Sequence, residues 1–271
     1  MRKWMIALAV FAVAFAVAPK KAGAQTTQYL YVGDVSLSSA VSGGTQGSPG
    51  TWSGAGDWVV YSEDSSGTIT LMKSSGSTIG VTANDLVGAT PTPGVLTVAG
   101  TIGAWTINID TASGAPAPGY PPGKELLSIN HTTTTGSTEL HVAYSQTGIA
   151  PVPASWVATF NGTFTTGGTA TASGSAFQGS DAFSLASQIG STMGPFSGSL
   201  IPFATSTSGP ANVIPPYSLT ETVDLTGVGA GTTTINGGLL LLPQTPEPSS
   251  ILLFGTGLLG LGGILRRRFL A

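Results

Sequence analysis

Metal binding is the chemistry that the chain's two histidines, His131 and His141, are best suited to perform. On one continuous strand, a separation of ten residues would place both side chains on the same face, because side-chain direction repeats every second residue. Glu139 is the one further ligand that stands out, whereas a metal site usually needs three or four converging ligands. The Thr-rich stretch 132–137 also favours a turn between the histidines. The sequence therefore predicts ordinary surface histidines, no metal site and no cofactor.

Hydrolytic and calcium-binding chemistry have weak sequence signals. The GxSxG motif of many serine hydrolases does not occur, although the members of a catalytic triad need not be close in sequence. The facing carboxylates that a glycosidase requires cannot be selected among the acidic residues by sequence alone. Glu63-Asp64 and Asn84-Asp85 could offer oxygen ligands to calcium, but no DxDxDG loop accompanies them. We expect no enzyme here, and we interpret these acids as solvated turn residues.

Sugar stacking is the chemistry suggested by Trp52 and Trp58, which flank the Gly-rich segment 53–57. Exposed aromatic rings next to glycines can stack on the faces of sugars. A tryptophan in a β-sandwich is, however, more often packed in the core or half-buried. The two tryptophans are therefore candidate carbohydrate contacts, with core packing as the alternative.

The charge distribution excludes one class of partner. The formal net charge is −3, but most basic residues lie near the two ends of the chain. Between residues 25 and 245 there are two lysines, Lys73 and Lys124, no arginine and eleven acidic residues. Such a stretch cannot neutralise a row of phosphates, so we expect no nucleic-acid binding.

The last residues of the chain read as a membrane anchor. Residues 249–265 carry no charge, and 17 residues make a helix about 25 Å long, which is short but adequate for a bilayer. Arg266, Arg267 and Arg268 follow, and a cationic flank of this kind stays on the cytoplasmic side. Within this segment, residues 255–260 match GxGxxG, but the chain ends before a dinucleotide-binding unit could form. We predict one transmembrane helix over 249–265, with the glycines allowing close helix packing.

A Pro-Glu-Pro step, formed by Pro246, Glu247 and Pro248, precedes this helix. Two prolines keep the backbone extended, where a protease could reach it. In this order, the step, the apolar stretch and the arginine cluster resemble the PEP-CTERM sorting signal of bacterial surface proteins, over residues 244–271. The resemblance implies a Gram-negative source, processing near Pro246–Pro248 by an exosortase, and release or attachment at the cell surface. It also implies an association with exopolysaccharide and biofilm matrix, and glycosylation of the exported part.

The first 24 residues have the features of a secretory signal peptide. Arg2 and Lys3 give it a basic start, an apolar stretch follows, and Ala22 and Ala24 form a small-x-small cleavage site. Cleavage there by the Sec export route would make Gln25 the first mature residue, and an uncleaved anchor is the alternative. The chain contains no cysteine, so stability outside the cell cannot come from disulfide bonds. The predicted route crosses the inner membrane and leads to the cell surface or extracellular matrix.

The part between the two signals, residues 25–243, predicts an all-β fold. Apolar and polar residues alternate over 105–110 and 139–144, as in half-buried strands. Asn161-Gly162 between apolar runs favours a hairpin turn at that point. Residues 218–225 and 232–242 read as a closing pair of strands, in which Glu221 shares a face with apolar residues. Residues 180–189 are a helix candidate, with a strand as the alternative.

These short strands, separated by turn residues, predict one antiparallel β-sandwich. The Gly- and Pro-rich stretch 114–123 is interpreted as a long surface loop, with a linker between two domains as the alternative. The leading functional hypothesis is a non-catalytic exported protein of the cell surface or extracellular matrix. Its expected partners are the exosortase, the Sec machinery and, transiently, the inner membrane, with exopolysaccharide as a candidate ligand. A carbohydrate-binding or adhesion module is the first alternative, and a secreted hydrolase is the second.

Overall fold

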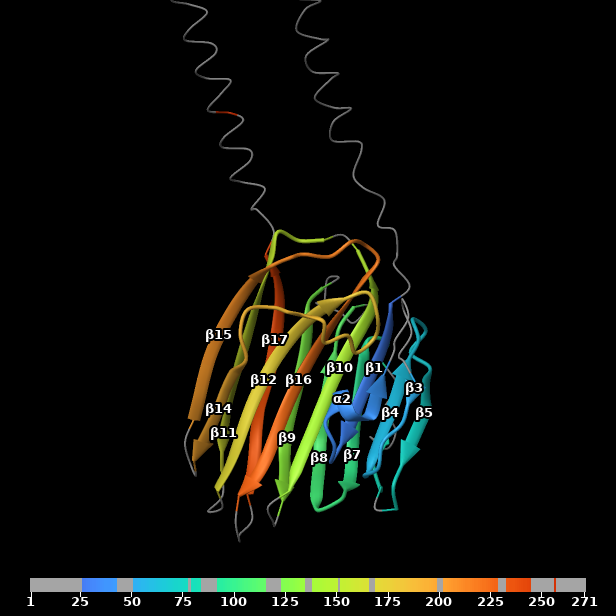
Figure 1. The fold of residues 1–271 in the computed structure, drawn as a ribbon, viewed down its shortest axis with the longest axis vertical. Helices are drawn as coiled ribbons and strands as arrows, with labels where there is room; N and C mark the ends of the chain where they lie inside the picture. The colour runs from blue at the N-terminus through green and yellow to red at the C-terminus, as the bar shows by residue number, and fades with distance from the viewer. Residues whose placement is uncertain are drawn as a thin grey trace, which may run out of the picture.

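A computed structural model describes the fold. It covers residues 26–42, 51–77, 79–83, 92–115, 123–134, 138–150, 152–165, 169–198, 202–228 and 233–244, together with residue 256. Within these residues the elements are almost all β-strands, and the helix α2 (Leu37–Ala40) is a single turn. Two sheets face each other in two layers (Figure 1). The all-β antiparallel sandwich predicted from the sequence is thus confirmed.

The first layer is an eight-stranded sheet in the described part of the chain. Its order is β13-β12-β16-β10-β1-β4-β5, and β14 pairs with β12 beside this path. In chain order, its strands are β1 (Thr27–Gly33), β4 (Trp58–Glu63), β5 (Ile69–Ser75), β10 (Glu139–Ile149), β12 (Thr169–Gly179), β13 (Ser187–Gln188), β14 (Met193–Gly198) and β16 (Tyr217–Val228).

The second layer is a seven-stranded sheet, again counted over the described residues. Its order is β15-β11-β17-β9-β8-β7-β6. In chain order, its strands are β6 (Thr82–Ala83), β7 (Val95–Ile102), β8 (Trp105–Ser113), β9 (Glu125–Thr134), β11 (Ser155–Phe164), β15 (Pro202–Pro210) and β17 (Thr233–Gln244). β2 (Val41–Ser42) and β3 (Thr51–Trp52) form a separate small pair.

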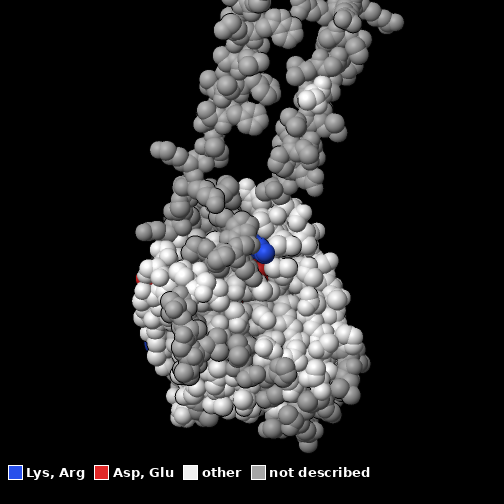
Figure 2. Space-filling view, turned by 180° about the vertical axis from the view of Figure 1, so that it is seen from behind, with Lys and Arg blue, Asp and Glu red and all other residues white. Residues whose placement is uncertain are grey.

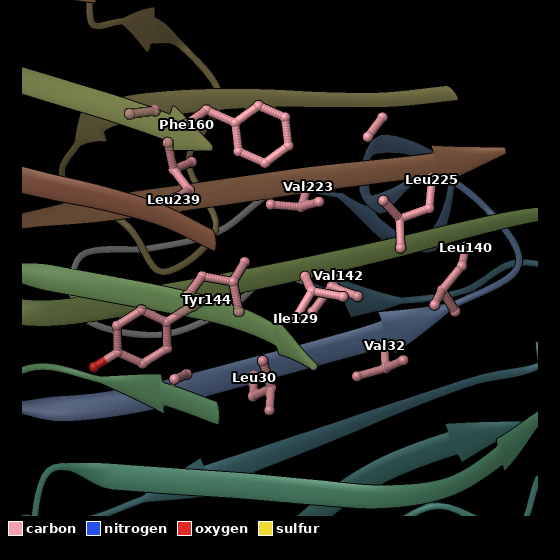
Figure 3. Close-up of a cluster of buried hydrophobic side chains, with 14 of the residues drawn as sticks. Leu30, Val32, Ile129, Leu140, Val142, Tyr144, Phe160, Val223, Leu225 and Leu239 are labelled. Atoms are coloured by element: carbon pink, nitrogen blue, oxygen red, sulfur yellow. The ribbon is translucent and has the colours of Figure 1, made fainter. Parts of the chain in front are cut away.

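The main core lies between the two sheets (Figure 3). It forms because alternate residues of each strand point inward, as Leu140, Val142 and Tyr144 do on β10. On the facing sheet, Trp156 and Phe160 of β11 are also buried. Full burial of one large apolar side chain contributes roughly 1.5–3 kcal/mol. The strands expected around 105–110 and 139–144 are therefore confirmed, and the core they build explains how a chain without disulfides holds together.

A second, smaller apolar cluster lies on the outer face of the eight-stranded sheet. The helix α2 covers this face beside β1 and β10 (Figure 1). Leu37 and Ala40 of the helix are buried there against tyrosine and tryptophan rings from β1, β3 and β4. This outer cluster therefore closes one half of a sheet face that would otherwise be open to solvent.

The hairpin expected at Asn161-Gly162 is wrong, because β11 runs straight through these residues. Gly162 lies opposite Gly237 of β17. A Cβ atom on Gly162 would come within 2.5 Å of the Asn236 carbonyl oxygen and 2.6 Å of the Phe203 ring. The glycine is thus required by close packing inside the sheet. A turn and a tight strand contact select the same residue, so the sequence signal was ambiguous.

Two further expectations need correction. No helix forms over 180–189, where the described chain makes turns and then the short strand β13. The predicted closing strands exist as β16 and β17, but they lie in different sheets and face each other across the core. Glu221 does point inward from β16, as its position in the pattern predicted.

The loop over 114–123 connects neighbours within one sheet. Ser113, the last residue of β8, pairs with Leu126 of β9. Residues 116–122 themselves lie outside the described chain. The two strands that flank this stretch therefore belong to one layer of the sandwich.

Candidate functional site

The predicted sorting and membrane residues fall outside the described chain. This applies to Pro246, Glu247 and Pro248, to Arg266, Arg267 and Arg268, and to Ala22 and Ala24 of the signal peptide. Of the predicted transmembrane segment 249–265, only Thr256 is described. Among the described residues, none of the helices has the length and apolar character needed to cross a bilayer. The structure therefore leaves both terminal predictions as they stand.

The two candidate sugar-stacking residues are buried. Trp52 of β3 is 8% exposed and Trp58 of β4 is 1% exposed. Trp52 stacks on Tyr31, with ring centroids 5.9 Å apart, and meets the edge of Phe183 at 5.6 Å. Because both indoles are occupied by this outer cluster, neither offers a ring face to a sugar. The expectation of sugar stacking is corrected to the alternative, aromatic core packing.

The two histidines lie in different sheets, His131 on β9 and His141 on β10, so they do not converge. His141 is held instead by two carboxylates on the outer face of the eight-stranded sheet. Its Nδ1 lies 2.6 Å from Asp224 Oδ1, and its Nε2 lies 3.3 Å from Glu139 Oε2. Burial lowers the pKa of His141, but the hydrogen bonds and charges of Asp224 and Glu139 outweigh burial and raise it above its usual value.

This arrangement ties β10 to β16 and uses both ring nitrogens of His141. A catalytic base needs one nitrogen free to take a proton from a nucleophile. The described residues contain no group of three histidine, cysteine, aspartate or glutamate side chains that could hold a metal ion. The His141 cluster is therefore best described as a structural ion-pair network.

An acidic hollow of about 410 Å³ borders this network at one end of the sandwich. Its lining includes Glu139, Asp34 at the end of β1, and Thr138. Asp34 Oδ1 accepts a hydrogen bond from the Asp57 amide at 2.7 Å, so this carboxylate also braces the chain. Both acids in its lining, Asp34 and Glu139, already make contacts that hold the fold together.

Glu63 and Asp64, interpreted from the sequence as solvated turn residues with calcium binding as the alternative, differ in burial, so the interpretation is wrong for Glu63. Glu63 is fully buried and accepts a hydrogen bond from the Gly94 amide at 3.0 Å. Burial raises the pKa of Glu63 to about 7, with that hydrogen bond acting in the opposite direction. Asp64 is exposed and holds a turn through the amides of Ser66 and Thr68. Glu63 and Asp64 therefore point to different surroundings and cannot bind one calcium ion together. Asn84 and Asp85 lie outside the described chain.

A hollow lined by carboxamides lies on the seven-stranded sheet. It measures about 480 Å³, and its lining includes Asn130 of β9, Asn161 of β11 and Asn236 of β17, with Ser128 and Thr163. Gly162 and Gly237, which pair with each other across β11 and β17, also line the hollow and bring no side chain into it. The result is a neutral recess with hydrogen-bond donors and acceptors in its wall.

The face around this recess carries little charge. Figure 2 views the molecule from the side of the seven-stranded sheet, and few charged atoms are visible on its described surface. Among the described residues that line the recess, the aromatic one is Phe203, which is 9% exposed. Sequence reasoning missed this recess, because its asparagines come from three strands far apart in the chain.

Two acids lie inside the main core. Glu125 begins β9, and Glu221 lies near the middle of β16 in the facing sheet. Both are 0% exposed. The sequence pattern indicated Glu221, whereas Glu125 was missed because it follows a Pro- and Gly-rich loop at the very start of its strand.

Comparison with known proteins gives a specific result for the C-terminal residues. The sequence profile of the PEP-CTERM protein-sorting motif matches residues 244–268. No curated protein matches the chain in sequence. The matched residues include the Pro-Glu-Pro step, the apolar stretch and the arginine cluster.

Solved structures offer only distant likenesses. One is a carbohydrate-binding module of the β-sandwich superfamily, at 14% identity over 78% of this chain and 82% of that chain, with a TM-score of 0.30. Another is the CBM22-1 xylan-binding domain from Paenibacillus barcinonensis, at 12% identity over 64% of this chain and 98% of that chain, with a TM-score of 0.28. A third is the VP2 subviral particle of infectious bursal disease virus, at 12% identity over 83% of this chain and 53% of that chain, with a TM-score of 0.29.

None of these likenesses states what this chain binds. The sorting motif, by contrast, concerns a defined stretch and a defined fate, namely export through membrane-associated sorting to the cell surface or extracellular space. At residues 244–268, after a two-sheet β-sandwich, the chain thus carries the PEP-CTERM sorting motif of an exosortase-processed exported protein.

Proposed function

We propose that this protein is a non-catalytic structural component of the bacterial cell surface or extracellular matrix. The observation that carries the proposal is the sorting motif at residues 244–268, which begins at the last residue of β17. The motif directs the chain to export and sorting, and the β-sandwich is the folded domain that is exported. Exosortase is the expected processing partner, and the inner membrane is the place where processing occurs.

The body supports a structural role through its polar surface chemistry. Few charged atoms are visible on the described outer face of the seven-stranded sheet (Figure 2), and the recess on it is lined by the amides of Asn130, Asn161 and Asn236 and the hydroxyls of Ser128 and Thr163. Such a surface can hydrate, bind hydroxyl-rich polymers and accept added sugar without strong charge attraction to other molecules. Both ring nitrogens of His141 are held by Asp224 and Glu139, which favours a structural role over a catalytic one.

The test is the mass and cell fraction of the mature protein. We expect the wild-type chain to lose its first 24 residues and to be cut near Pro246–Pro248 before it reaches the surface or medium. A triple variant, P246A/E247A/P248A, should accumulate uncut in the membrane fraction. Thr245→Ala, just outside the Pro-Glu-Pro step, is the matched control and should be processed normally.

Two results would contradict the proposal. One is normal cutting and release of the triple variant. The other is turnover of a polysaccharide by the purified protein that disappears when a single carboxylate is replaced. The same intact-mass measurement reports glycosylation, because a mass equal to that of the bare processed chain would leave no added sugar.

A second candidate function is binding of a neutral polysaccharide, and the carboxamide-lined recess favours it. Asn130, Asn161 and Asn236 offer both donors and acceptors, which suits vicinal sugar hydroxyls, and the recess has no charge that would have to be desolvated. Binding through hydrogen bonds alone, without an aromatic platform, would be weak and would gain from many repeats along one polymer.

This second function predicts that N161A/N236A binds the producing cell's exopolysaccharide about thirtyfold more weakly than wild type, because each of the two substitutions loses a hydrogen bond that contributes roughly 1 kcal/mol. The measurement is retention on immobilised polysaccharide. Ser206→Ala is the control, since Ser206 lies exposed on β15 outside the recess. Equal retention of all three proteins would remove this candidate while leaving the sorting and structural role intact.

A further inference from the structure

The two buried acids, Glu125 and Glu221, enter the same interior from opposite sheets. Glu125 pairs with Leu241 of β17, and Glu221 pairs with Tyr144 of β10. The main-chain amides of Leu241 and Leu127 lie close enough to Glu221 to influence its titration. Leu241 is the strand partner of Glu125, and Leu127 is two residues further along the same strand. The carboxyl group of Glu221 therefore reaches across the core to the place where Glu125 begins β9.

The two carboxyl groups are poorly satisfied by hydrogen bonds. All four carboxylate oxygens are buried without a donor at hydrogen-bonding distance and angle among the described residues. The other interior acid is different, since Glu63 of β4 has one oxygen bound by the Gly94 amide. The pair thus stands out among the buried acids of the described chain.

The groups that pack around the pair bring no positive charge. Tyr217 on β16 and Tyr144 on β10 are the titratable groups nearest to it, and both phenols are neutral at physiological pH. β12 contributes Ala176 opposite Glu221, and β17 contributes Leu241. Of the basic residues whose burial is described, Lys73 is exposed, and Lys124, next to Glu125, and His141 are partly exposed.

Two ionised carboxylates in such a site would be strongly unfavourable. Burial of an unpaired charge costs several kcal/mol, and a like charge nearby adds to that cost. Burial raises the pKa of Glu125 well above its usual value. For Glu221, burial acts first and the nearby Glu125 charge second, and both raise the pKa; the amides of Leu241 and Leu127 act in the opposite direction but are outweighed. Proton uptake is the simplest way to neutralise the pair, because it needs no additional space in a packed core.

We infer that Glu125 and Glu221 form a buried proton-binding site, which keeps at least one proton between the two sheets at neutral pH and loosens their contact when the proton is lost. The inference is independent of the proposed function. It makes the stability of the sandwich respond to the pH around the cell surface.

The sign of the response follows from linkage. In the unfolded chain both acids ionise at their ordinary pKa, near 4.3. In the folded chain they hold a proton to higher pH, so the folded state binds more protons than the unfolded state over that window. The contribution of the two acids to the free energy of unfolding is therefore largest below about pH 4 and decreases as the pH rises. Each proton retained only by the folded state changes the folding equilibrium constant about tenfold per pH unit.

The experiment compares the denaturant midpoints of four full-length chains, purified in mild detergent, between about pH 5 and about pH 9. Wild type should lose stability steadily with rising pH. The double variant E125Q/E221Q keeps the side-chain size without the ionisation, so its loss should be smaller by at least tenfold in equilibrium constant across that range. Ser206→Ala, at an exposed hydroxyl of β15 in the sheet that faces the sheet of His141, is the matched control and should lose stability as wild type does. Glu63→Gln separates the contribution of the other interior acid.

The decisive quantity is the difference between wild type and the double variant. Parallel curves for the two chains would overturn the inference. So would recovery of wild type at high pH by millimolar calcium or magnesium, absent in the double variant, because the pair would then bind a divalent cation instead of a proton. Infrared spectroscopy of the wild-type chain gives a second measurement if the double variant fails to fold. It should show the carbonyl stretch of a buried protonated carboxyl group at neutral pH, and its absence would equally overturn the inference.

Discussion

Asp224 and Glu221 lie three residues apart on β16, and this odd spacing places them on opposite faces of the eight-stranded sheet. Asp224 points outward and meets the His141 ring at 2.6 Å. Glu221 points inward and meets another carboxyl group and an apolar core. Two acids on one strand thus experience opposite chemistry within a few residues.

The contrast teaches that the face of a strand decides which partners an acid meets. On the outer face, the Asp224 carboxylate has a histidine as its ion-pair partner. On the inner face, no cation is at hand, and neutralisation by a proton takes its place. The same comparison extends to the aromatic residues, since Trp156 packs in the main core and Trp52 in the outer cluster.

The largest expected effect comes from truncating the inner face. Trp156→Ala should lower the free energy of unfolding by about 3–5 kcal/mol, because Trp156 is fully buried and leaves a large cavity. Trp52→Ala should cost clearly less, since the small outer cluster can relax toward solvent. Denaturant midpoints of both variants measure the difference. Equal losses would show that the two faces are packed with the same rigidity.

The next effect concerns Glu63 and sharpens the comparison among inward-facing acids. Its pKa is raised to about 7, so its contribution to stability is present below its usual pKa and is lost as the pH rises toward 7. Glu63→Gln keeps an oxygen for the Gly94 amide and should remove up to about a hundredfold of the pH-dependent change in the folding equilibrium constant. Midpoints measured at about pH 5 and about pH 8 test this. An unchanged pH dependence would mean that Glu63 ionises normally in the fold.

A smaller effect is expected on the outer face, at Asp224. The raised pKa of His141 means that its stabilisation is present below its unfolded pKa, near 6.5, and is lost as the pH rises through the folded value. Asp224→Asn should therefore cost about 1 kcal/mol in acid, discounted for partial exposure, and less in alkali. An NMR titration of His141 gives the direct readout. A histidine pKa that Asp224→Asn does not lower would break the comparison.

The smallest expected effect is that of Glu139→Gln. The Glu139 side chain is 61% exposed and lies 3.3 Å from the histidine Nε2. Exposed ion pairs contribute less than about 1 kcal/mol, and we expect under about 0.5 kcal/mol here. A larger loss of stability in the same denaturant measurement would indicate that the Glu139–His141 ion pair is more shielded from solvent than the 61% exposure of Glu139 implies.

The sequence predicted those features of the fold that depend on local alternation. Leu140, Val142 and Tyr144 revealed a half-buried strand, and Glu221 was placed on an apolar face, because side-chain direction follows residue parity. Strand pairing was not accessible in the same way. β1 pairs with β10, more than a hundred residues later, and no local pattern encodes such a register.

The candidate sites were harder to predict for a related reason. Gly162 carried a turn signal that belonged to a close strand contact, and Trp52 and Trp58 carried a sugar-binding signal that belonged to aromatic packing. The carboxamide recess draws Asn130, Asn161 and Asn236 from three strands, so only the folded sheet brings them together. The sorting motif was predictable, since its information is contiguous in the chain.

The end of β17 has a consequence for the life of the protein after export. Gln244 is the last described residue of the sandwich and still pairs with Ser155, while the Pro-Glu-Pro step begins two residues later. A cut at that step therefore severs no rung of either sheet. β1 starts at the same end of the sandwich (Figure 1), so the proposed removal of the signal peptide and the proposed cut near Pro246–Pro248 would both act at that end and leave the opposite end unchanged. The processed protein would therefore separate from its membrane segment without having to refold.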